Sequence, residues 1–311
     1  MTKIIIMIKK IKSKPILIYE TTYSQMTTLA ISDYLKQASP LSGRNLRQYF
    51  FKGLVYLNHK KAHSQAKLKN GDLIQVFKPG GEQSTLAHEI MHLDIIYENA
   101  DLLVINKPPQ LAVHPSGNIT RGTLANGVAA YFEKKNLQIK VRPVNRLDYG
   151  TSGLIIFAKR AETQTQLTAA TQNNHIQRIY YSVVKGVPSP KTGVIDLPIG
   201  HSPEIKANQR TVSEEGKAAV TYYEVIEELN GNALLELSLK TGRTHQIRVH
   251  LRSCGFPILG DPQYGIPSPF IKRSALHAGK LIFSGAGMTI PELAAPFPED
   301  FKALLNALRH N

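Results

Sequence analysis

The stretch RPVNRLDYGTSGLIIFAK at residues 142–159 joins a polar turn to a short apolar run. The apolar run has the length and composition of a buried strand, so Asp148 is expected on a loop that leads directly into that strand. The turn is made of small residues, Gly150, Thr151, Ser152 and Gly153. Glycine allows unusual backbone angles and hydroxyl groups hydrogen-bond nearby amides, so we expect a stiff loop that fixes a carboxylate.

Asp148 by itself has simpler explanations, because an aspartate in a loop commonly caps its turn or pairs with a neighbour such as Arg146. Residues 145–153, however, resemble the motif His-Arg-Leu-Asp-x-x-Thr-Ser-Gly of the RluA-type pseudouridine synthases. They match every fixed position except the first, where Asn145 replaces histidine. The resemblance implies that Asp148 is the catalytic residue. We predict that activity survives the Asn145 replacement, because this position neighbours the loop without joining the bond chemistry.

Charge and length limit the possible functions. The 311 residues suffice for a large domain and a small module, and the apolar fraction of 42% is ordinary. The net charge of +15 and the pI near 9.7 favour a polyanionic partner, either nucleic acid or an anionic membrane. Residues 1–80 hold 14 basic and three acidic residues, a net charge of +11, whereas the remaining 231 hold 24 basic and 20 acidic, a net charge of +4. The polyanion-binding surface is therefore expected mainly in the N-terminal part.

The single cysteine, Cys254, excludes an intramolecular disulfide and an all-cysteine zinc site, and it favours a reducing compartment such as the cytoplasm. The 11 histidines show no metal-ligand spacing, so no metal is expected. Residues 1–15 form a basic extension whose longest uncharged run is too short for a signal peptide or a membrane span. Translation could also begin at Met7.

Two helices are expected near the N-terminus, at residues 28–37 and 44–52, with Gly53 as a C-terminal cap. Strands are expected at residues 55–57 and 73–76. This order resembles the S-four-like RNA-binding domain, although His59 stands where a glycine is usual. The implied RNA surface consists of the cations Arg44, Arg47 and Lys52, with Lys60 and Lys61 in the next turn.

The middle of the chain alternates strands and helices. A buried strand at residues 102–105 runs into Asn-Lys-Pro-Pro and then Val-His-Pro, which resembles the family's Asn-Lys-Pro-x-Gly-x-x-Val-His-Pro segment. Gln110 replaces the glycine, which leaves the turn type open, and Lys107 is a candidate contact to the RNA backbone. Helices are expected at residues 123–134, capped by Thr123, and at residues 162–171.

Residues 178–186, RIYYSVVKG, alternate like a strand with two half-buried faces. They resemble the family's basic-x-Tyr-x-Ala-x-Val-x-Gly motif, with Ser182 in place of alanine. The resemblance implies that Tyr180 belongs to the active site, where its ring can stack on a displaced uracil. A tyrosine in a strand is otherwise usually a core residue.

Residues 239–252 contain TGRTHQIRVH, the family's third motif, without a gap. The spacing predicts a helix from Thr244 that ends at Gly255, with a cationic outer face that includes His245 and Arg248. A solvated amphipathic helix would explain the spacing equally well. The resemblance instead assigns Arg248 to an ion pair with the catalytic aspartate, and a nearby arginine favours the ionised form of a carboxylate.

The remaining signatures, at residues 260–265, 276–278 and 295–301, occur in the family's order. We therefore predict an α+β protein with a pseudouridine synthase domain, built on a mixed, mainly antiparallel sheet flanked by helices, and a small α/β RNA-binding domain. The predicted boundaries are an extension at residues 1–19, the RNA-binding domain at 20–80, a linker at 81–88 and the catalytic domain at 89–311. The expected RNA contacts in the catalytic domain are Lys107, Arg146, Arg178, Arg243 and His245.

The resemblance implies isomerisation of uridine to pseudouridine in structured RNA, most simply ribosomal RNA, with transfer RNA as the alternative substrate. The reaction has no net oxidation or hydrolysis, so no cofactor is expected, and a monomer without membrane attachment suffices. A non-catalytic RNA-binding or ribosome-assembly protein would explain the charge, but it would not need Asp148, Tyr180 and Arg248. A glycoside- or nucleoside-hydrolysing enzyme would need a second carboxylate or a metal, and none is evident near Asp148.

Overall fold

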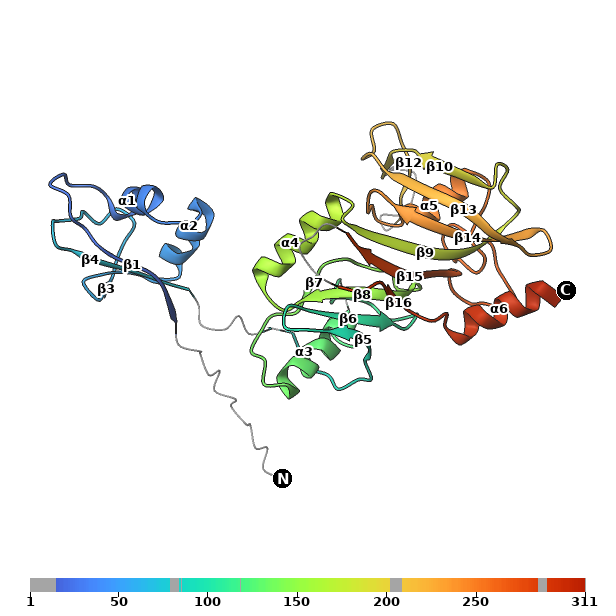
Figure 1. Cartoon of the computed structure of the whole chain (residues 1–311), viewed down its shortest axis with the longest axis horizontal. Coiled ribbons are helices and arrows are strands. Elements are labelled where there is room, and N and C mark those ends of the chain that lie inside the picture. Colours follow the sequence, from blue (N-terminus) through green and yellow to red (C-terminus); the bar gives the residue numbers. More distant parts are fainter. Residues whose placement is uncertain are drawn as a thin grey trace, which may run out of the picture. The chain divides into compact units, whose positions relative to one another are not determined.

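The protein is described from a computed structural model that covers residues 15–78, 84, 86–117, 119–201, 209–284 and 290–310. The chain forms two compact units, Met1–Gln83 and Ser84–Asn311 (Figure 1). Within the described ranges, no helix is both long and apolar enough to cross a membrane. Half of the expected linker, and all of residues 1–14 with Met7, lie outside the described residues.

The N-terminal unit packs two helices on a four-stranded antiparallel sheet with the strand order β1-β4-β2-β3. Its elements are β1 (Ile16–Thr22), α1 (Ile31–Ala38), α2 (Gly43–Phe51), β2 (Val55–Leu57), β3 (Lys60–Lys61) and β4 (Leu73–Lys78). Buried aliphatic side chains from both layers, such as Leu35, Leu46 and Ile74, form one core.

Two turns of this unit show why its sequence folds as it does. Gly53 follows α2 with φ +62° and donates its amide to Phe50 O, which confirms the expected helix cap. Asn58 and His59 connect β2 and β3 with φ values of 49° and 62°. Both residues are therefore left-handed, as a two-residue hairpin of type I′ requires, so His59 adopts the conformation that a glycine would supply.

The expected extent of the N-terminal extension was wrong. Strand β1 begins at Ile16 and pairs with β4, so residues 16–19 belong to the sheet instead of preceding it. The error arose because Ile and Lys alternate irregularly before Tyr19, and the pairing partner lies more than fifty residues later in the chain.

The C-terminal unit is organised around a ten-stranded sheet with the main order β10-β13-β14-β9-β15-β8-β6-β5. Its strands are β5 (Asp94–Glu98), β6 (Leu102–Lys107), β7 (Arg142–Pro143), β8 (Ser152–Ala158), β9 (Ile176–Lys185), β10 (Thr192–Asp196), β13 (Val220–Glu228), β14 (Asn232–Leu239), β15 (Leu276–Phe283) and β16 (Leu293–Ala294). A separate pair joins β11 (Ile199–Gly200) to β12 (Thr211–Val212). Among the described pairings, β8 with β15 is the parallel one, so the sheet is mixed and mainly antiparallel, as predicted.

Four helices cover this sheet: α3 (Leu124–Lys134), α4 (Ala161–Gln172), α5 (Gln246–Ser253) and α6 (Glu299–His310). Leu103 and Ile105 of β6 join a core with residues of α3, α5 and α6. Leu102 and Val104 join a second core with α4. Because side chains alternate along a strand, α4 therefore covers the face opposite the other three helices.

Local chemistry fixes several boundaries. Thr123 caps α3 through a capping box with Asn126, as the sequence predicted for Thr123. Gln110 has φ +58°, so it takes the left-handed conformation of the glycine that it replaces. Helix α5 begins at Gln246, two residues later than predicted, because His245 is left-handed with φ +59°.

Strand β9 is more buried than the alternating pattern predicted. The side chains of one face, Tyr180, Ser182 and Val184, are all buried, and so is Val183 on the opposite face. The strand lies between β14 and β15, with both of its edges hydrogen-bonded (Figure 1). Tyr180, Val183 and Val184 pack into the main core, and such contacts with distant segments cannot be read from the residue pattern.

Candidate active site

Asp148 lies at a cavity where three segments of the C-terminal unit meet. These are the loop before β8, the start of β9, and the loop between β14 and α5. The cavity is lined by Arg146, Leu147, Asp148, Thr151, Arg178, Tyr180, Leu239, Gly242, Arg243, Thr244, His245, Gln246, Ile247, Arg248 and Leu276. Of the residues of this unit that were expected to contact RNA, Lys107 is absent from this lining.

The carboxylate of Asp148 accepts a hydrogen bond from Arg248, with Nη1 3.1 Å from Oδ2. Arg248 is itself fixed by Asp261 through two hydrogen bonds, Nε to Oδ2 at 2.6 Å and Nη2 to Oδ1 at 2.7 Å. The described charged contacts of the Asp148 carboxylate are with Arg248 and, more loosely, with His245, and the alternative pairing with Arg146 is not among them. The expected ion pair is present, with a second carboxylate behind it.

The Asp261 carboxylate is fully buried, and its environment holds it in the charged form. Burial by itself would raise the pKa of Asp261, but the hydrogen bonds and charge of Arg248 lower it below the usual range. Burial likewise opposes the charge of Arg248, yet Asp261 and then Asp148 raise the pKa of Arg248. The pair therefore places a permanent, rigidly oriented cation beside Asp148.

The prediction that Arg248 lies on a solvent-facing cationic side of α5 was wrong. Arg248 is 6% exposed and points into the cavity instead of the solvent. Its guanidinium also lies 4.9 Å from the centre of the Tyr264 ring. A helical wheel assigns charged residues to the solvent side, whereas this charge is neutralised by Asp261 from another segment.

His245 contacts Asp148 more loosely, with Nε2 3.9 Å from Oδ2. Its Nδ1 lies 2.8 Å from the hydroxyl of Tyr264. Burial lowers the pKa of His245 despite the opposing charge of Asp148. A neutral imidazole at this position can donate one hydrogen bond and accept another without adding a charge to the cavity.

Tyr180 and four aliphatic side chains make the cavity partly apolar. Tyr180 is 5% exposed, and burial raises the pKa of its hydroxyl. The aliphatic lining residues are Leu147, Leu239, Ile247 and Leu276.

Gln246 holds the loop that closes the cavity, although nothing in the sequence drew attention to it. Its Oε1 accepts from Arg243 N at 2.9 Å and from the Thr241 hydroxyl at 2.8 Å. Its Nε2 donates to Val220 O at 3.0 Å. These bonds leave Arg243 exposed at the rim, anchored by its Nε to Ala218 O.

Lys107 does not fit the RNA contact predicted for it. It is 0% exposed, and its Nζ donates to the carbonyls of Pro108, Leu111 and Tyr149. Burial, followed by the charge of Arg273, lowers the pKa of Lys107 to about 7. The side chain ties the turn after β6 to the Asp148 loop, and an RNA phosphate cannot reach its ammonium group in this conformation.

Two further side chains hold the Asp148 loop. Arg273 donates from Nη1 to Gly150 O at 3.2 Å and pairs with Asp300. Asn145 accepts from Ile156 N at 2.8 Å through Oδ1 and donates from Nδ2 to Leu154 O at 3.3 Å. Asn145 thus connects the segment before the loop to strand β8 through two hydrogen bonds.

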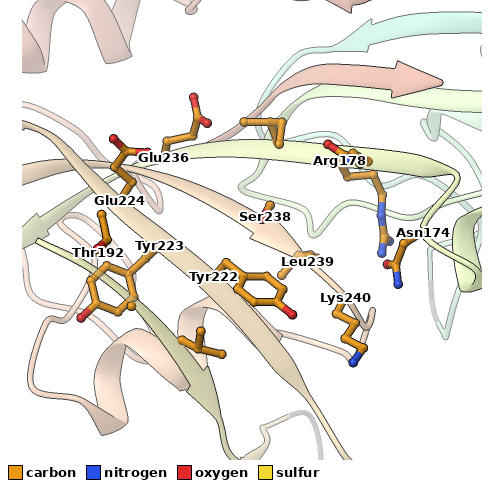
Figure 2. A pocket seen from close by; sticks show the side chains of 14 residues that line it. Asn174, Arg178, Thr192, Tyr222, Tyr223, Glu224, Glu236, Ser238, Leu239 and Lys240 are labelled. Carbon is orange, nitrogen blue, oxygen red and sulfur yellow. The ribbon is translucent and has the colours of Figure 1, made fainter. Parts of the chain in front are cut away.

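A second hollow lies on the other face of the sheet (Figure 2). The strand register places Ile179, Ser238 and Tyr222 in one row, so their side chains point away from the face that carries Tyr180. This hollow also contains the carboxylates of Glu224 and Glu236, which Figure 2 shows on the same side. The cations Arg178 and Lys240 line this hollow as well, so its lining carries charges of both signs.

The structure adds site residues that the sequence did not single out, namely Asp261, Gln246, Tyr264 and Arg273. Asp261 and Tyr264 belong to the segment GDPQYG, which was noted as a signature without a role. Within the described part of the chain, no group of three or more His, Cys, Asp or Glu side chains is placed to hold a metal ion.

Three of the expected N-terminal cations lie on or next to helix α2, whereas Lys60 and Lys61 form strand β3 instead of lying in a turn. Arg44 and Arg47 lie on α2, and Lys52 follows it as the C-cap residue. All three are exposed, as is Phe51, whose residue is 92% accessible. The unit thus presents a cationic helix with an unburied aromatic ring.

Comparison with known proteins gives a consistent result. The sequence pattern of the family described as RNA pseudouridylate synthase matches residues 101–253. A Bacillus subtilis protein named uncharacterized RNA pseudouridine synthase YlyB is 39% identical over 277 residues, which cover 87% of this chain and 90% of that protein. Ribosomal large subunit pseudouridine synthase D of Neisseria meningitidis serogroup A is 37% identical over 283 residues, covering 86% of this chain and 75% of that protein.

Solved structures agree. Human RNA pseudouridylate synthase domain containing 4 superposes with a TM-score of 0.58 at 27% identity, covering 69% of this chain and 92% of that one. Human RNA pseudouridylate synthase domain containing 1, at 24% identity and a TM-score of 0.53, shares the fold over 72% of this chain and 97% of that one. With the ordered motifs around Asp148, Tyr180 and Arg248, these likenesses show that the chain belongs to the RNA pseudouridine synthase family, of the RluA type, and is an isomerase.

Proposed function

We propose that this enzyme converts specific uridines of structured ribosomal RNA to pseudouridine, with Asp148 as the reacting carboxylate. One observation carries the proposal: Asp148 lies in a partly apolar cavity, 3.1 Å from an arginine that a buried Asp261 holds in place. A fixed cation keeps the carboxylate oriented before substrate arrives, so little reorganisation is needed during the reaction.

The reaction breaks the bond between C1′ of ribose and N1 of uracil, rotates the base, and joins C1′ to C5. The proton on C5 is released, and N1 gains one, so the overall change is an isomerisation. An ionised Asp148 can attack C1′ or remove a proton from the sugar, and both routes start from the same carboxylate. Arg248 balances its charge in either case.

Tyr180 is assigned to the base. Its ring lines the cavity, and the raised pKa of its hydroxyl keeps the proton in place. A protonated phenol can hydrogen-bond to a uracil carbonyl while the ring packs against the base. Leu147 and Leu276 exclude water from the same space.

The rim residues are assigned to the RNA backbone. Arg146 and Arg243 are exposed beside the cavity, and Arg178 and His245 line it. The Nε of Arg178 is buried with no hydrogen-bond partner among the described residues, which suits an arginine that completes its contacts with substrate. Cations here would hold the phosphates that flank a uridine turned out of its stack.

The N-terminal unit is assigned to RNA binding, as an S-four-like domain with Arg44, Arg47 and Lys52 as its phosphate contacts. The exposed cationic helix α2 supports this assignment, together with the net charge of +11 in residues 1–80. All residues assigned to catalysis lie in one chain, so a monomer suffices.

Ribosomal RNA is the favoured substrate because several relatives, including those of Neisseria meningitidis and Nitrosomonas europaea, are named ribosomal large subunit pseudouridine synthase D. Such a substrate places the activity in the cytoplasm. Transfer RNA is the alternative. Asn145 is assigned a structural role, because both ends of its amide bond to the backbone of β8.

The test is pseudouridine mapping on total RNA by carbodiimide-dependent primer-extension stops. Cells with the wild-type protein are compared with a deletion, with Asp148→Asn, and with Asp196→Asn, which changes an exposed carboxylate of the same unit. We expect one or more ribosomal sites to vanish in the deletion and in Asp148→Asn but to remain in Asp196→Asn. Loss of sites confined to transfer RNA would instead identify the alternative substrate. A deletion that keeps every site would overturn the proposal.

A further inference from the structure

The loop that carries Asp148 is held by a buried arginine from a distant segment. Arg273 is 3% exposed, and its Nη1 donates to Gly150 O at 3.2 Å, Ser274 O at 3.0 Å and Leu276 O at 3.2 Å. A backbone bond from Thr151 N to Asp148 O closes the same turn at 3.1 Å. Arg273 thus connects the turn of the catalytic loop to the start of β15.

The opposite side of this arginine faces the C-terminal helix. Its Nε donates to Asp300 Oδ2 at 2.7 Å, and its Nη2 donates to Asp300 Oδ1 at 2.8 Å. Asp300 lies in the first turn of α6, and Phe301, Leu304 and Leu305 anchor that helix in the main core. A planar, two-bond pair of this kind fixes the guanidinium in orientation as well as in position.

We propose that Arg273 and Asp300 are positioning residues for the reaction, which couple helix α6 to the loop of Asp148. The inference rests on the proposed role of Asp148. Arg248, which faces the carboxylate, is held separately by Asp261. Asp148 and Arg248 are therefore held in place by different residues. A shift of Gly150 would move Asp148 while Arg248 stays in place.

The size of the effect follows from geometry. Displacing a reacting group by about 1 Å can lower a rate by about a hundredfold. Neither Arg273 nor Asp300 lines the cavity. Losing their pairing should therefore lower kcat and leave the KM for RNA nearly unchanged, because the rim contacts remain.

Helix α6 offers a matched control for a purely structural role. Near its other end, Arg309 makes an equivalent two-bond pair with Glu227, at 2.8 and 2.7 Å. Glu227 lies on β13 and does not line the Asp148 cavity. Glu227→Gln thus removes an ion pair of the same helix without touching the catalytic loop.

The experiment compares Asp300→Asn, Glu227→Gln, Asp148→Asn and the wild-type full chain. Tritium release is measured with RNA from the deletion strain grown on 5-tritiated uracil, together with thermal unfolding. We expect Asp300→Asn to lower kcat by about tenfold to a hundredfold with little change in KM, and Glu227→Gln to keep the wild-type kcat. All assays are run below every unfolding midpoint.

Wild-type kcat in a folded Asp300→Asn protein would overturn the inference, as would equal losses in Asp300→Asn and Glu227→Gln. Activity in Asp148→Asn would instead overturn the proposed role of Asp148, so the two failures are distinct. If Asp300→Asn does not fold, Asp300→Glu replaces it under the same criterion, because it keeps the charge and displaces the carboxylate by one methylene.

Discussion

At the scale of single residues, the ion pair behind Asp148 has more energetic weight than an ordinary surface pair. Asp261 is 3% exposed and makes two short bonds to Arg248. Removing one member of a buried ion pair costs about 3 to 5 kcal/mol, and Arg248 would keep Asp148, at 3.1 Å, as its remaining carboxylate partner. We expect Asp261→Asn to lower the free energy of unfolding by about that amount, measured by urea denaturation, and to abolish most activity because Arg248 loses its anchor.

The control variant Glu227→Gln provides the comparison for this loss of unfolding free energy. Glu227 and Arg309 form a comparable two-bond pair at the surface, where side-chain exposures are 34% and 42%. Exposed pairs contribute about 0 to 1 kcal/mol, so Glu227→Gln should change the unfolding free energy little. Similar losses in both variants would contradict the view that burial decides the energy of the Asp261 pair.

His277 predicts an acid sensitivity. It is fully buried, its Nε2 donates to Ala295 O, and its Nδ1 accepts from the Ser152 hydroxyl at 2.9 Å. Burial lowers the pKa of His277 from 6.5 to about 4. The unfolded chain therefore takes up the proton first, and stability falls as the pH drops from about 6.5 to about 4, by up to about 1.4 kcal/mol per pH unit.

His277→Gln should remove this contribution, although it lowers stability at neutral pH. We expect its unfolding free energy, measured in urea between pH 7 and the acid range, to fall less steeply than that of the wild type. The exposed His92 gives the control, and His92→Gln should keep the wild-type slope. An unchanged slope in His277→Gln would show that other groups dominate the acid response.

At the scale of elements, the parallel junction of β8 and β15 depends on Gly153. Its φ is +111°, and an added Cβ would lie 2.2 Å from Ala278 O, so the two strands could not approach. We expect Gly153→Ala to cost more than about 4 kcal/mol of unfolding free energy, or to prevent folding. Urea denaturation and soluble yield measure the effect.

A substitution at Gly231 distinguishes the energetic cost of the positive φ from the cost of the clash between an added Cβ and β15. Gly231 also has a positive φ, +72°, but nothing lies within 4 Å of an added Cβ. Gly231→Ala should therefore show only the backbone penalty of about 1 to 2 kcal/mol. A similar loss for both variants would mean that backbone angle, and not the close approach of β15, explains the glycine.

At the scale of the whole molecule, the charge distribution predicts how RNA affinity responds to salt. Neutralising Arg44, Arg47 and Lys52 to glutamine should reduce the slope of log affinity against log salt by about 2 to 3, because each lost phosphate contact removes about 0.7 to 0.9. Filter binding to ribosomal RNA over a range of potassium chloride concentrations measures this slope. The kcat at saturating RNA should stay unchanged.

A second triple variant tests whether the position of the cations matters, because it removes the same number of positive charges from other parts of the unit. Lys67, Lys69 and Lys78 are exposed in the same unit but lie outside α2. If α2 is the contact surface, changing these three lysines to glutamine should alter the slope much less. Equal changes in both triple variants would indicate that overall charge, and not the helix, drives RNA binding.

The sequence by itself determined the features that arise from neighbouring residues. Local hydrogen bonding explains the cap of α3 at Thr123 and the glycine, Gly53, that ends α2. Hydrophobic spacing explains the buried run of β8. The ordered motifs placed Asp148, Tyr180 and Arg248 in one site because resemblance carries spatial information that periodicity lacks.

Only the tertiary structure decided what surrounds that site. Arg248 meets Asp148 across 100 residues of sequence, and Arg273 reaches Gly150 across 123. Lys107 was expected to meet RNA, yet folding surrounds it with carbonyl groups. The reason is physical: a side chain's charge can be read from its identity, but its burial and its partners depend on which distant segments the sheet brings together.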